Sequence, residues 1–236
     1  MPRDQREREE EAGSAARLEA KPGTPGGGGT AGLHRLKLRS KREALLQVPE
    51  AAIGKSAALA VMLHGAGGNA EHGLGILNGA GSAAGLIVLA PESRKASWDI
   101  ISDAQYGPDV SFIDECLEDV FSRYAIDPAR IALGGFSDGA SYALSLGLSN
   151  GLLFQYILAF SPGFMAPVRI EGEPRIFMSH GTQDTVLPID PCSRRVARAL
   201  RAHQLPVEYR EFEGPHTVPR EIREEALGFF LGGEGE

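Results

Sequence analysis

Short apolar runs alternate with amphipathic segments along most of this chain, and this alternation strongly limits the folds it can adopt. Six runs have the length and composition of strands: Ala57–Leu63, Leu86–Ala90, Arg130–Leu133, Tyr156–Phe160, Arg175–Met178 and Val207–Phe212. Strands that are apolar on both faces are typical of the inside of a parallel sheet covered by helices.

The segments between these runs have the spacing of helices. Asp109–Tyr124 ends before Asp127-Pro128 and places its apolar residues on one stripe, and Ser193–His203 and Glu221–Leu231 repeat the pattern. Because strands and helices alternate, we predict an α/β fold: a mostly parallel, doubly wound sheet with helices on both faces. Ligands of such sheets bind at the carboxyl ends of the strands.

A hairpin is expected before the first of these strands. Leu33–Leu38 alternates apolar and polar residues, and a second extended run, Ala44–Val48, follows a charged turn. The pattern predicts an antiparallel hairpin at one edge of the sheet.

The first 32 residues differ in composition from the rest. A charged run, Arg6–Glu11, is followed by the Gly/Pro-rich stretch Pro22–Gly29, with almost no large apolar side chains. Such a segment is expected to be a disordered tail. Residues 33–236 are then expected to form one α/β domain, since 236 residues that are 42% hydrophobic would hold a second domain only with difficulty.

Charge and cysteine content exclude several classes of function. A net charge of −7 and a pI near 5.5 argue against nucleic acid or an anionic membrane as the main partner. No signal-peptide pattern and no apolar stretch of spanning length occurs, so a soluble cytoplasmic protein without a membrane span is expected. Cys116 and Cys192 form neither a disulfide scaffold nor a metal motif, and we expect no metal or organic cofactor.

Ser137 lies at a candidate site for chemistry, in Gly135-Phe136-Ser137-Asp138-Gly139. A sharp strand-to-helix turn of this G-x-S-x-G type exposes a serine hydroxyl so that a neighbouring base can activate it. In a chain with 30 glycines the pattern alone carries little weight, and its alternative is an ordinary turn serine. The residues at other strand ends therefore decide between the two.

Two further polar residues follow strands where a catalytic acid and histidine would be needed. Asp184 comes after Arg175–Met178, and His216 comes after Val207–Phe212. The order serine, acid, histidine is that of the α/β-hydrolase triad. We therefore predict Ser137 as nucleophile, Asp184 as acid and His216 as base.

Each assignment has alternatives. Asp184 could instead cap its own turn, and Asp190 is the main rival acid, although it stands between prolines where the chain leaves the strand end. The rival histidines to His216 are His64, His72, His180 and His203. His180 begins the loop that carries Asp184 and is predicted to brace that turn.

The loop His64-Gly65-Ala66-Gly67-Gly68-Asn69 directly follows Ala57–Leu63. Its glycines let backbone N–H groups approach an oxygen closely, as an oxyanion hole requires. The alternatives are a flexible turn and a phosphate loop, but a Walker-type loop would continue with Lys-Ser or Lys-Thr, which is missing here.

Together these motifs resemble the phospholipase/carboxylesterase family of α/β-hydrolases, which includes acyl-protein thioesterases. The resemblance covers roughly residues 33–231 and rests on His64–Gly68, Gly135–Gly139, Ala159–Gly163, His180–Pro188 and Gly214–His216. Ser97-Trp98-Asp99 is similar to a tryptophan-aspartate stretch that family members carry in a loop lining the pocket. A packed aromatic is the alternative for Trp98.

The resemblance implies a serine carboxylesterase that hydrolyses esters, or thioesters, of small or short-acyl substrates through an acyl-enzyme. It also implies oxyanion donors on the backbones of Ala66 and Asp138, and substrate contacts from four residues: His64, Gly65, Gly67 and Trp98. Asp138 departs from the glutamine usual in acyl-protein thioesterases, which weakens the case for that role.

Other functions remain open at this point. Within enzymes these are acyl-protein thioesterase, lysophospholipase, dienelactone-type hydrolase and peptidase. A hydrolase-fold binding protein is the alternative outside enzymes. The expected partner is a small-molecule ester, and the motifs imply no particular oligomeric state.

Overall fold

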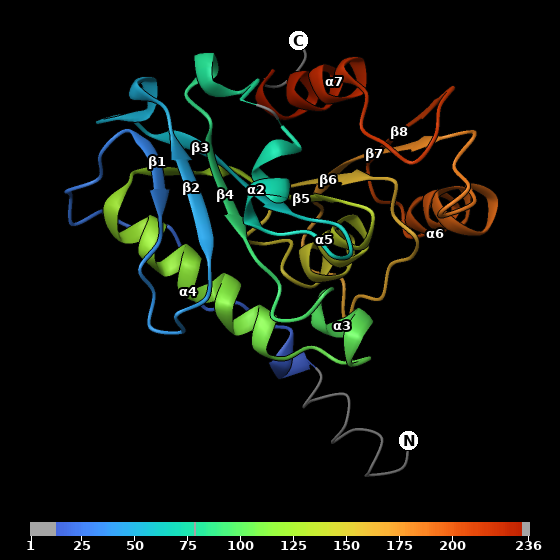
Figure 1. Cartoon of the computed structure of the whole chain (residues 1–236), viewed down its shortest axis with the longest axis horizontal. Coiled ribbons are helices and arrows are strands. Elements are labelled where there is room, and N and C mark those ends of the chain that lie inside the picture. The colour runs from blue at the N-terminus through green and yellow to red at the C-terminus, as the bar shows by residue number, and fades with distance from the viewer. Residues whose placement is uncertain (1–12, 78, 233–236) are drawn as a thin grey trace.

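The computed structural model describes residues 13–77 and 79–232, and these form a three-layer α/β structure (Figure 1). One sheet of eight strands runs through it in the order β1-β2-β4-β3-β5-β6-β7-β8. The strands are β1 (Gly32–Arg35), β2 (Ala44–Val48), β3 (Ala57–Leu63), β4 (Ile87–Pro91), β5 (Ile126–Phe136), β6 (Tyr156–Phe160), β7 (Arg175–Gly181) and β8 (Val207–Phe212).

The strands from β4 to β8 pair in parallel, whereas β1 and β2 form an antiparallel hairpin that joins the sheet through β4. In the hairpin Leu33 pairs with Gln47 and Arg35 with Leu45. The predicted fold class, a mostly parallel sheet with an antiparallel hairpin at one edge, is confirmed.

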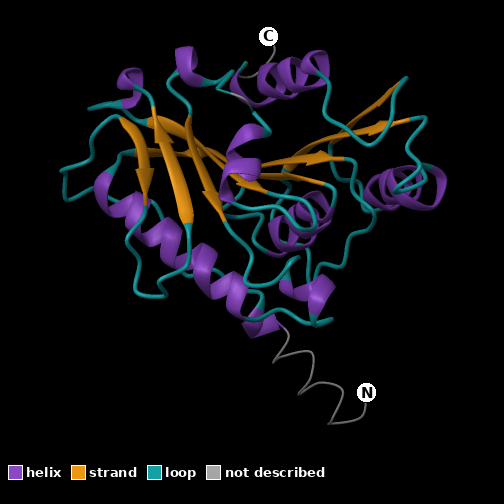
Figure 2. Ribbon diagram, in the orientation of Figure 1, coloured by secondary structure: helices purple, strands orange, loops and turns teal. Residues whose placement is uncertain are grey.

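Helices cover both faces of the sheet (Figure 2). They are α2 (Ala70–Gly75), α3 (Asp99–Ser102), α4 (Pro108–Arg123), α5 (Asp138–Ser149), α6 (Arg195–Ala202) and α7 (Arg220–Leu231). Side chains of α4, α5 and α6 pack on one face of the sheet, and those of α7 pack on the other. Among the described residues, no helix combines the length and the apolar character needed to cross a membrane.

The apolar run of β3 shows why these segments fold as inner strands. Leu59, Val61 and Leu63 face the layer of α4 and α5, while Ala60 and Met62 face the layer of α7. All seven residues of β3 are buried. Since successive side chains of a strand point to opposite faces, a continuous apolar run is stable only between two helical layers.

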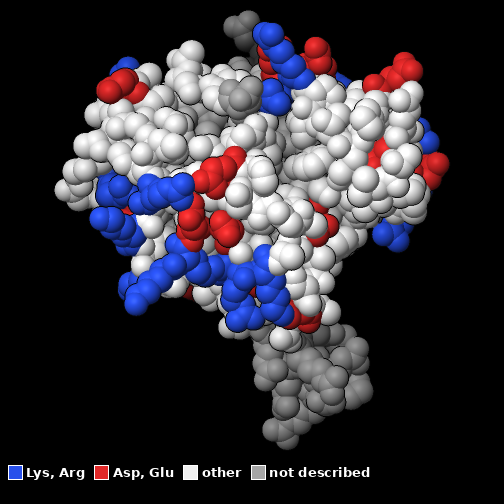
Figure 3. Space-filling view, in the orientation of Figure 1, with Lys and Arg blue, Asp and Glu red and all other residues white. Residues whose placement is uncertain are grey.

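Charged side chains of both signs are interspersed on the face shown in Figure 3. Basic residues gather near the β1–β2 hairpin, and acidic residues lie among them. Arg35 of β1 pairs with Glu43 and Glu71, and Arg39, between β1 and β2, pairs with Glu118 of α4. The hairpin region therefore carries ion pairs and not an unbroken basic patch.

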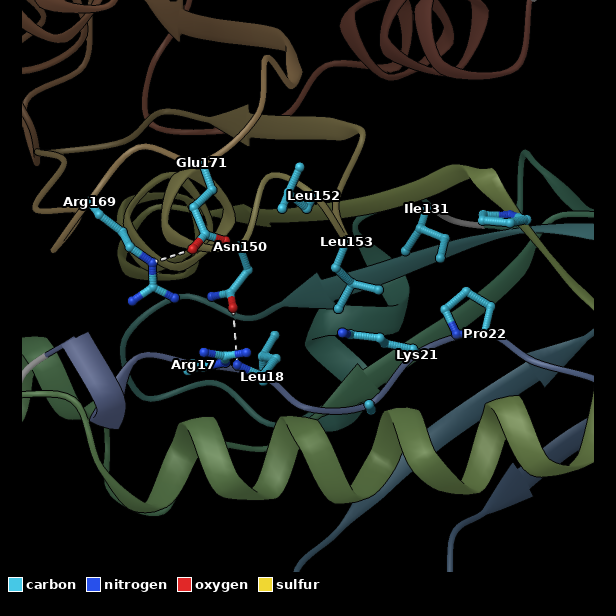
Figure 4. Close-up of a pocket in the computed structure, with 12 residues that line it drawn as sticks. Arg17, Leu18, Lys21, Pro22, Ile131, Asn150, Leu152, Leu153, Arg169 and Glu171 are labelled. Carbon is cyan, nitrogen blue, oxygen red and sulfur yellow. Dashed lines mark hydrogen bonds and ion pairs between the residues drawn. The ribbon is translucent and has the colours of Figure 1, made fainter.

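Part of the N-terminal segment packs on the domain, although its composition predicts disorder. Ala16, Leu18 and Ala20 are buried, and Asn150 holds the segment by donating from Nδ2 to Ala16 O and accepting at Oδ1 from Leu18 N. A cavity of about 370 Å³ lies between this segment and the domain (Figure 4). The expected disorder does not hold for this stretch, because small apolar side chains at alternate positions supply a buried face; residues 1–12 lie outside the described residues.

Candidate active site

Ser137 occupies a strained turn between β5 and α5. Its φ of 58° and ψ of −120° lie in a region that residues other than glycine rarely adopt. A Cβ atom on Gly139 would lie 2.1 Å from Leu63 O, and one on Gly135 would lie 2.5 Å from the backbone of Gly139. The turn is therefore possible only with glycine on both sides of the serine, which explains the G-x-S-x-G pattern physically.

Ser137, His216 and Asp184 come together at the carboxyl ends of three strands, β5, β8 and β7. Nε2 of His216 lies 2.9 Å from Ser137 Oγ, and its Nδ1 lies 2.5 Å from Asp184 Oδ2. The ring of Phe136 packs against the His216 ring at a centroid distance of 4.6 Å. Such a chain of contacts lets a histidine take a proton from a serine while a carboxylate orients the ring.

Asp184 is buried and nonetheless favours its ionised form. Burial alone would raise the pKa of this carboxyl. Hydrogen bonds outweigh that effect: Oδ1 accepts from Leu187 N at 2.8 Å and from Val186 N at 2.9 Å, and Oδ2 faces His216. The pKa of Asp184 is accordingly held below its ordinary value. Asp190, the rival acid, lies at the surface and pairs with Arg194 instead.

His180 braces the turn that carries Asp184, as its position in the sequence predicts. Its Nε2 lies 2.8 Å from Leu187 O, and its Nδ1 lies 2.5 Å from Ser193 Oγ. Burial is the main cause that lowers the pKa of this imidazole. Because Leu187 O can only accept, Nε2 carries the proton, and Nδ1 accepts from the Ser193 hydroxyl.

The glycine loop after β3 runs beside the serine. A Cβ atom on Gly65 would lie 3.3 Å from Ser137 Cβ. Gly67 has a φ of 67° and donates from its N–H to Ala96 O at 2.6 Å. The N–H groups of Ala66 and Asp138, in contrast, have no acceptor among the described residues. Two backbone donors thus remain available to an oxygen atom next to Ser137.

His64 begins the glycine loop, and its side chain and that of Trp98 are fully buried, at 0% exposure each. Trp98 Nε1 donates to His64 O at 2.9 Å, and its ring stacks on Tyr142 at 5.2 Å. His64 Nε2 accepts from Ser93 N at 3.0 Å, and burial lowers the pKa of His64. The prediction that these two side chains contact substrate is wrong, because both are occupied in holding the loop.

A buried acidic pair that the sequence analysis missed anchors the loop of Trp98. Asp109 Oδ1 accepts from Arg42 at 2.5 Å and from Arg94 N at 2.9 Å, and Asp109 Oδ2 accepts from Asp99 N at 2.9 Å. Asp99 Oδ2 in turn accepts from Gly107 N and Asp109 N. Burial is the main cause that raises the pKa of Asp99. No spacing rule connects residues so far apart in the chain, so the sequence offers no signal for this network.

Within the described residues, no group of histidine, cysteine, aspartate and glutamate side chains has the arrangement of a metal site. The groups gathered at the candidate site are the Ser137 hydroxyl, the His216 imidazole, the Asp184 carboxylate and the two backbone N–H groups.

Residues 103–229, more than half of the chain, match the sequence profile of the Phospholipase/Carboxylesterase family. The chain belongs to this family. The family segment includes Ser137, Asp184 and His216 and thus all three strand ends of the candidate site. Family membership and fold agree that the protein is an α/β-hydrolase.

Two curated relatives support this family assignment. A protein named probable feruloyl esterase C, from Aspergillus niger, is 31% identical over 105 residues, which are 44% of this chain and 37% of the relative. A putative esterase, NocK, from Nocardia uniformis subsp. tsuyamanensis, is 29% identical over 145 residues, or 57% of this chain and 42% of the relative. The matches thus span about two fifths of the length of these relatives.

Solved structures share the family's fold at low sequence identity. The fluorophosphonate-binding serine hydrolase FphF of Staphylococcus aureus has a TM-score of 0.70 at 14% identity and covers 86% of this chain and 99% of its own. An S-formylglutathione hydrolase from Agrobacterium tumefaciens has a TM-score of 0.68 at 15% identity, with coverages of 86% and 94%. These likenesses show the fold alone.

Proposed function

We propose that this protein is a serine carboxylesterase that hydrolyses carboxylic esters through a covalent acyl-enzyme. One observation carries the proposal: Ser137 Oγ lies 2.9 Å from His216 Nε2, while His216 Nδ1 lies 2.5 Å from Asp184 Oδ2. The strained backbone of Ser137 and the two unpaired N–H groups beside it support the same reading.

In the proposed mechanism, Ser137 Oγ attacks the ester carbonyl while His216 takes the hydroxyl proton. Asp184 orients the ring and stabilises the imidazolium that forms. His216 then gives the proton to the leaving alcohol, and the acyl group remains bonded to Ser137 Oγ. In the second half, His216 takes a proton from water, whose oxygen attacks the acyl carbonyl. His216 then returns the proton to Ser137 Oγ as the bond to the acyl carbon breaks, which releases the acid and the free serine.

A negative charge develops on the carbonyl oxygen during the reaction. We assign its stabilisation to the backbone N–H groups of Ala66 and Asp138. Both belong to backbone that close packing holds in place, so they need no rearrangement when the charge appears. Loss of one such donor costs about 3 to 4 kcal/mol of transition-state stabilisation in comparable enzymes. Ala66 and Asp138 act through the backbone, so side-chain substitution does not remove either donor.

Small esters, or thioesters, with short acyl groups are the proposed substrates. The named esterase function of the two curated relatives supports ester chemistry at this site. A series of p-nitrophenyl esters with increasing acyl length measures how deep the acyl pocket is. A preference for acetyl and butyryl esters over decanoyl and longer esters would support the proposal, and the reverse preference would favour lysophospholipase or acyl-protein thioesterase activity.

Covalent labelling separates this enzyme from a hydrolase-fold binding protein. A fluorophosphonate reacts only with a serine that a neighbouring base activates. We expect one adduct on Ser137 of the folded protein, located by peptide mass spectrometry, and none after heat denaturation. A folded protein that hydrolyses no ester and gains no adduct would be a binding protein.

A further inference from the structure

Asp138 follows the nucleophile directly and brings a carboxylate next to it. Its Oδ2 accepts a hydrogen bond from Ser97 Oγ at 2.5 Å, and its side chain is half-buried. Its carboxylate carbon is joined to the amide nitrogen that is the proposed oxyanion donor through Cα and Cβ alone. The charge therefore lies close to the reacting carbonyl and not at a distant rim.

No positive side chain among the described residues neutralises this charge. Lys95, in the same loop as Ser97, pairs with Asp103, and no described lysine, arginine or histidine forms an ion pair with Asp138. The hydroxyl of Ser97 donates to the carboxylate, and the N-terminus of α5 adds partial positive charge. Neither of these contacts is a cationic side chain. The Asp138 carboxylate thus lies at the candidate site without a cationic partner among the described residues.

The order of the strands places Ser97, the partner of Asp138, on the opposite flank of the site from His216. Ser97 follows β4, whereas His216 follows β8, and β5 with Ser137 lies between these strands in the sheet. His216 must reach the leaving oxygen in order to protonate it, so the leaving alcohol lies on the β7–β8 flank. The acyl group then extends toward the flank of Ser97 and Asp138.

We propose that Asp138 makes the site selective for esters whose acyl group carries a positive charge, and against acyl groups that carry a carboxylate. The inference rests on the proposed function, because it requires that esters react at Ser137. Unit charges a few ångströms apart near a protein surface change a rate by roughly three- to tenfold, and salt weakens their interaction. The selectivity is expected to have that size in each direction.

The test compares three p-nitrophenyl esters of similar shape. The 4-(trimethylammonio)butanoate carries a cation, the 5,5-dimethylhexanoate replaces the nitrogen by carbon, and the glutarate monoester carries a carboxylate. The quantity of interest is kcat/KM for each charged ester divided by that for the neutral ester. This ratio cancels any change that a substitution makes to the basal rate.

For the wild-type protein we expect a ratio roughly three- to tenfold above one for the cationic ester and below one by a similar factor for the anionic ester. In Asp138→Asn both ratios should move to about one. Asp190→Asn is the matched control, because it removes the same charge from the surface and leaves Arg194 paired with Glu211. Unchanged ratios in Asp138→Asn, or equal changes in both variants, would overturn the proposal.

Two further measurements keep the test decisive. If Asp138→Asn does not fold, the wild-type ratios at about 20 mM and about 500 mM salt replace it, and they should approach one at the higher concentration. Ratios that are already one at low salt would overturn the proposal. Retained hydrolysis in Ser137→Ala would instead contradict the proposed function itself, so the two failures are distinguishable.

Discussion

Nε2 of His180 lies 3.1 Å from Oδ2 of Asp184, the same carboxylate oxygen that faces His216. The Nε2–H of His180 donates to Leu187 O and also faces this oxygen from the protein interior, where the His180 side chain is fully buried. Backbone N–H groups thus hold Oδ1 of Asp184, and two imidazoles lie against its Oδ2. This arrangement fixes the oxygen that in turn orients His216.

The donor on His180 should therefore affect catalysis. In His180→Asn the amide reaches only the position of Nδ1, so the donor that binds Leu187 O and faces Asp184 is lost. We expect kcat/KM to fall about two- to tenfold, the value of a neutral hydrogen bond that holds the turn of Asp184. In His180→Gln the amide reaches the position of Nε2, and most activity should return. Equal rates for the two variants on p-nitrophenyl butyrate would contradict this role.

Stability should decrease as the solution becomes acidic. Burial lowers the pKa of His64 and His180 below 6.5, so below about that pH the unfolded chain binds protons that the folded protein does not. The contribution of these two histidines to the free energy of unfolding is complete above pH 6.5, and it is lost as the pH falls toward their pKa values in the folded protein. Urea unfolding at several pH values between about pH 7.5 and about pH 5.5 measures the slope of the unfolding free energy against pH.

His64→Gln should reduce that slope, whereas His203→Gln, at an exposed helix end, should leave it unchanged. A slope that is identical in wild type and His64→Gln would exclude His64 as a source of the pH dependence.

Gly139→Ala should disrupt the turn of the nucleophile. Its Cβ would meet Leu63 O at 2.1 Å and His64 O at 2.5 Å, so either α5 or the glycine loop must move. We expect a loss of about 1–3 kcal/mol in unfolding free energy and loss of most esterase activity. Gly228→Ala in α7 is the control: its Cβ meets nothing within 4 Å, and alanine should stabilise the helix by about 0.5–1 kcal/mol. Wild-type activity in Gly139→Ala would refute the assigned geometry.

Asn150→Ala should destabilise the protein without affecting catalysis. The substitution leaves Leu18 N and Ala16 O without their partner, at a cost of about 1–3 kcal/mol in urea unfolding. Asn150 follows α5, at the end opposite Ser137, so kcat/KM should not change. Arg17→Ala, exposed in the same segment, should cost less than about 0.5 kcal/mol. Equal stabilities of the two variants would show that the segment is not held by Asn150.

Local patterns predicted most of the sheet. The bounds of β3, β6 and β8 agree with the apolar runs, because each run is bounded by polar or turn residues. For β5 the predicted run, Arg130–Leu133, is shorter than the strand, which extends from Ile126 to Phe136. Ile126 pairs with Ala57 and Ile131 pairs with Leu59, and the polar residues between Ile126 and Ile131 lie at an irregularity between these two pairs. Hydrophobic patterning does not detect a strand that contains such a polar, bulged stretch.

The sequence predicts where three residues of the candidate site lie, but it does not predict how the side chains of Trp98 and His64 are oriented. Ser137, Asp184 and His216 each follow a strand, so parallel pairing brings them to one edge of the sheet. The side chains of Trp98 and His64 turn inward because of contacts with each other and with Tyr142. Contacts of this kind depend on the packing of separate loops, which no local pattern encodes.

Ser137→Ala tests whether Ser137 is the nucleophile. The substitution removes only the hydroxyl oxygen, and circular dichroism and urea unfolding establish that the variant folds. We expect hydrolysis of p-nitrophenyl butyrate to fall by about 10⁴-fold or more, to the residual rate that binding and the oxyanion donors supply. A folded Ser137→Ala protein that hydrolyses this ester at the wild-type rate would show that Ser137 is not the nucleophile.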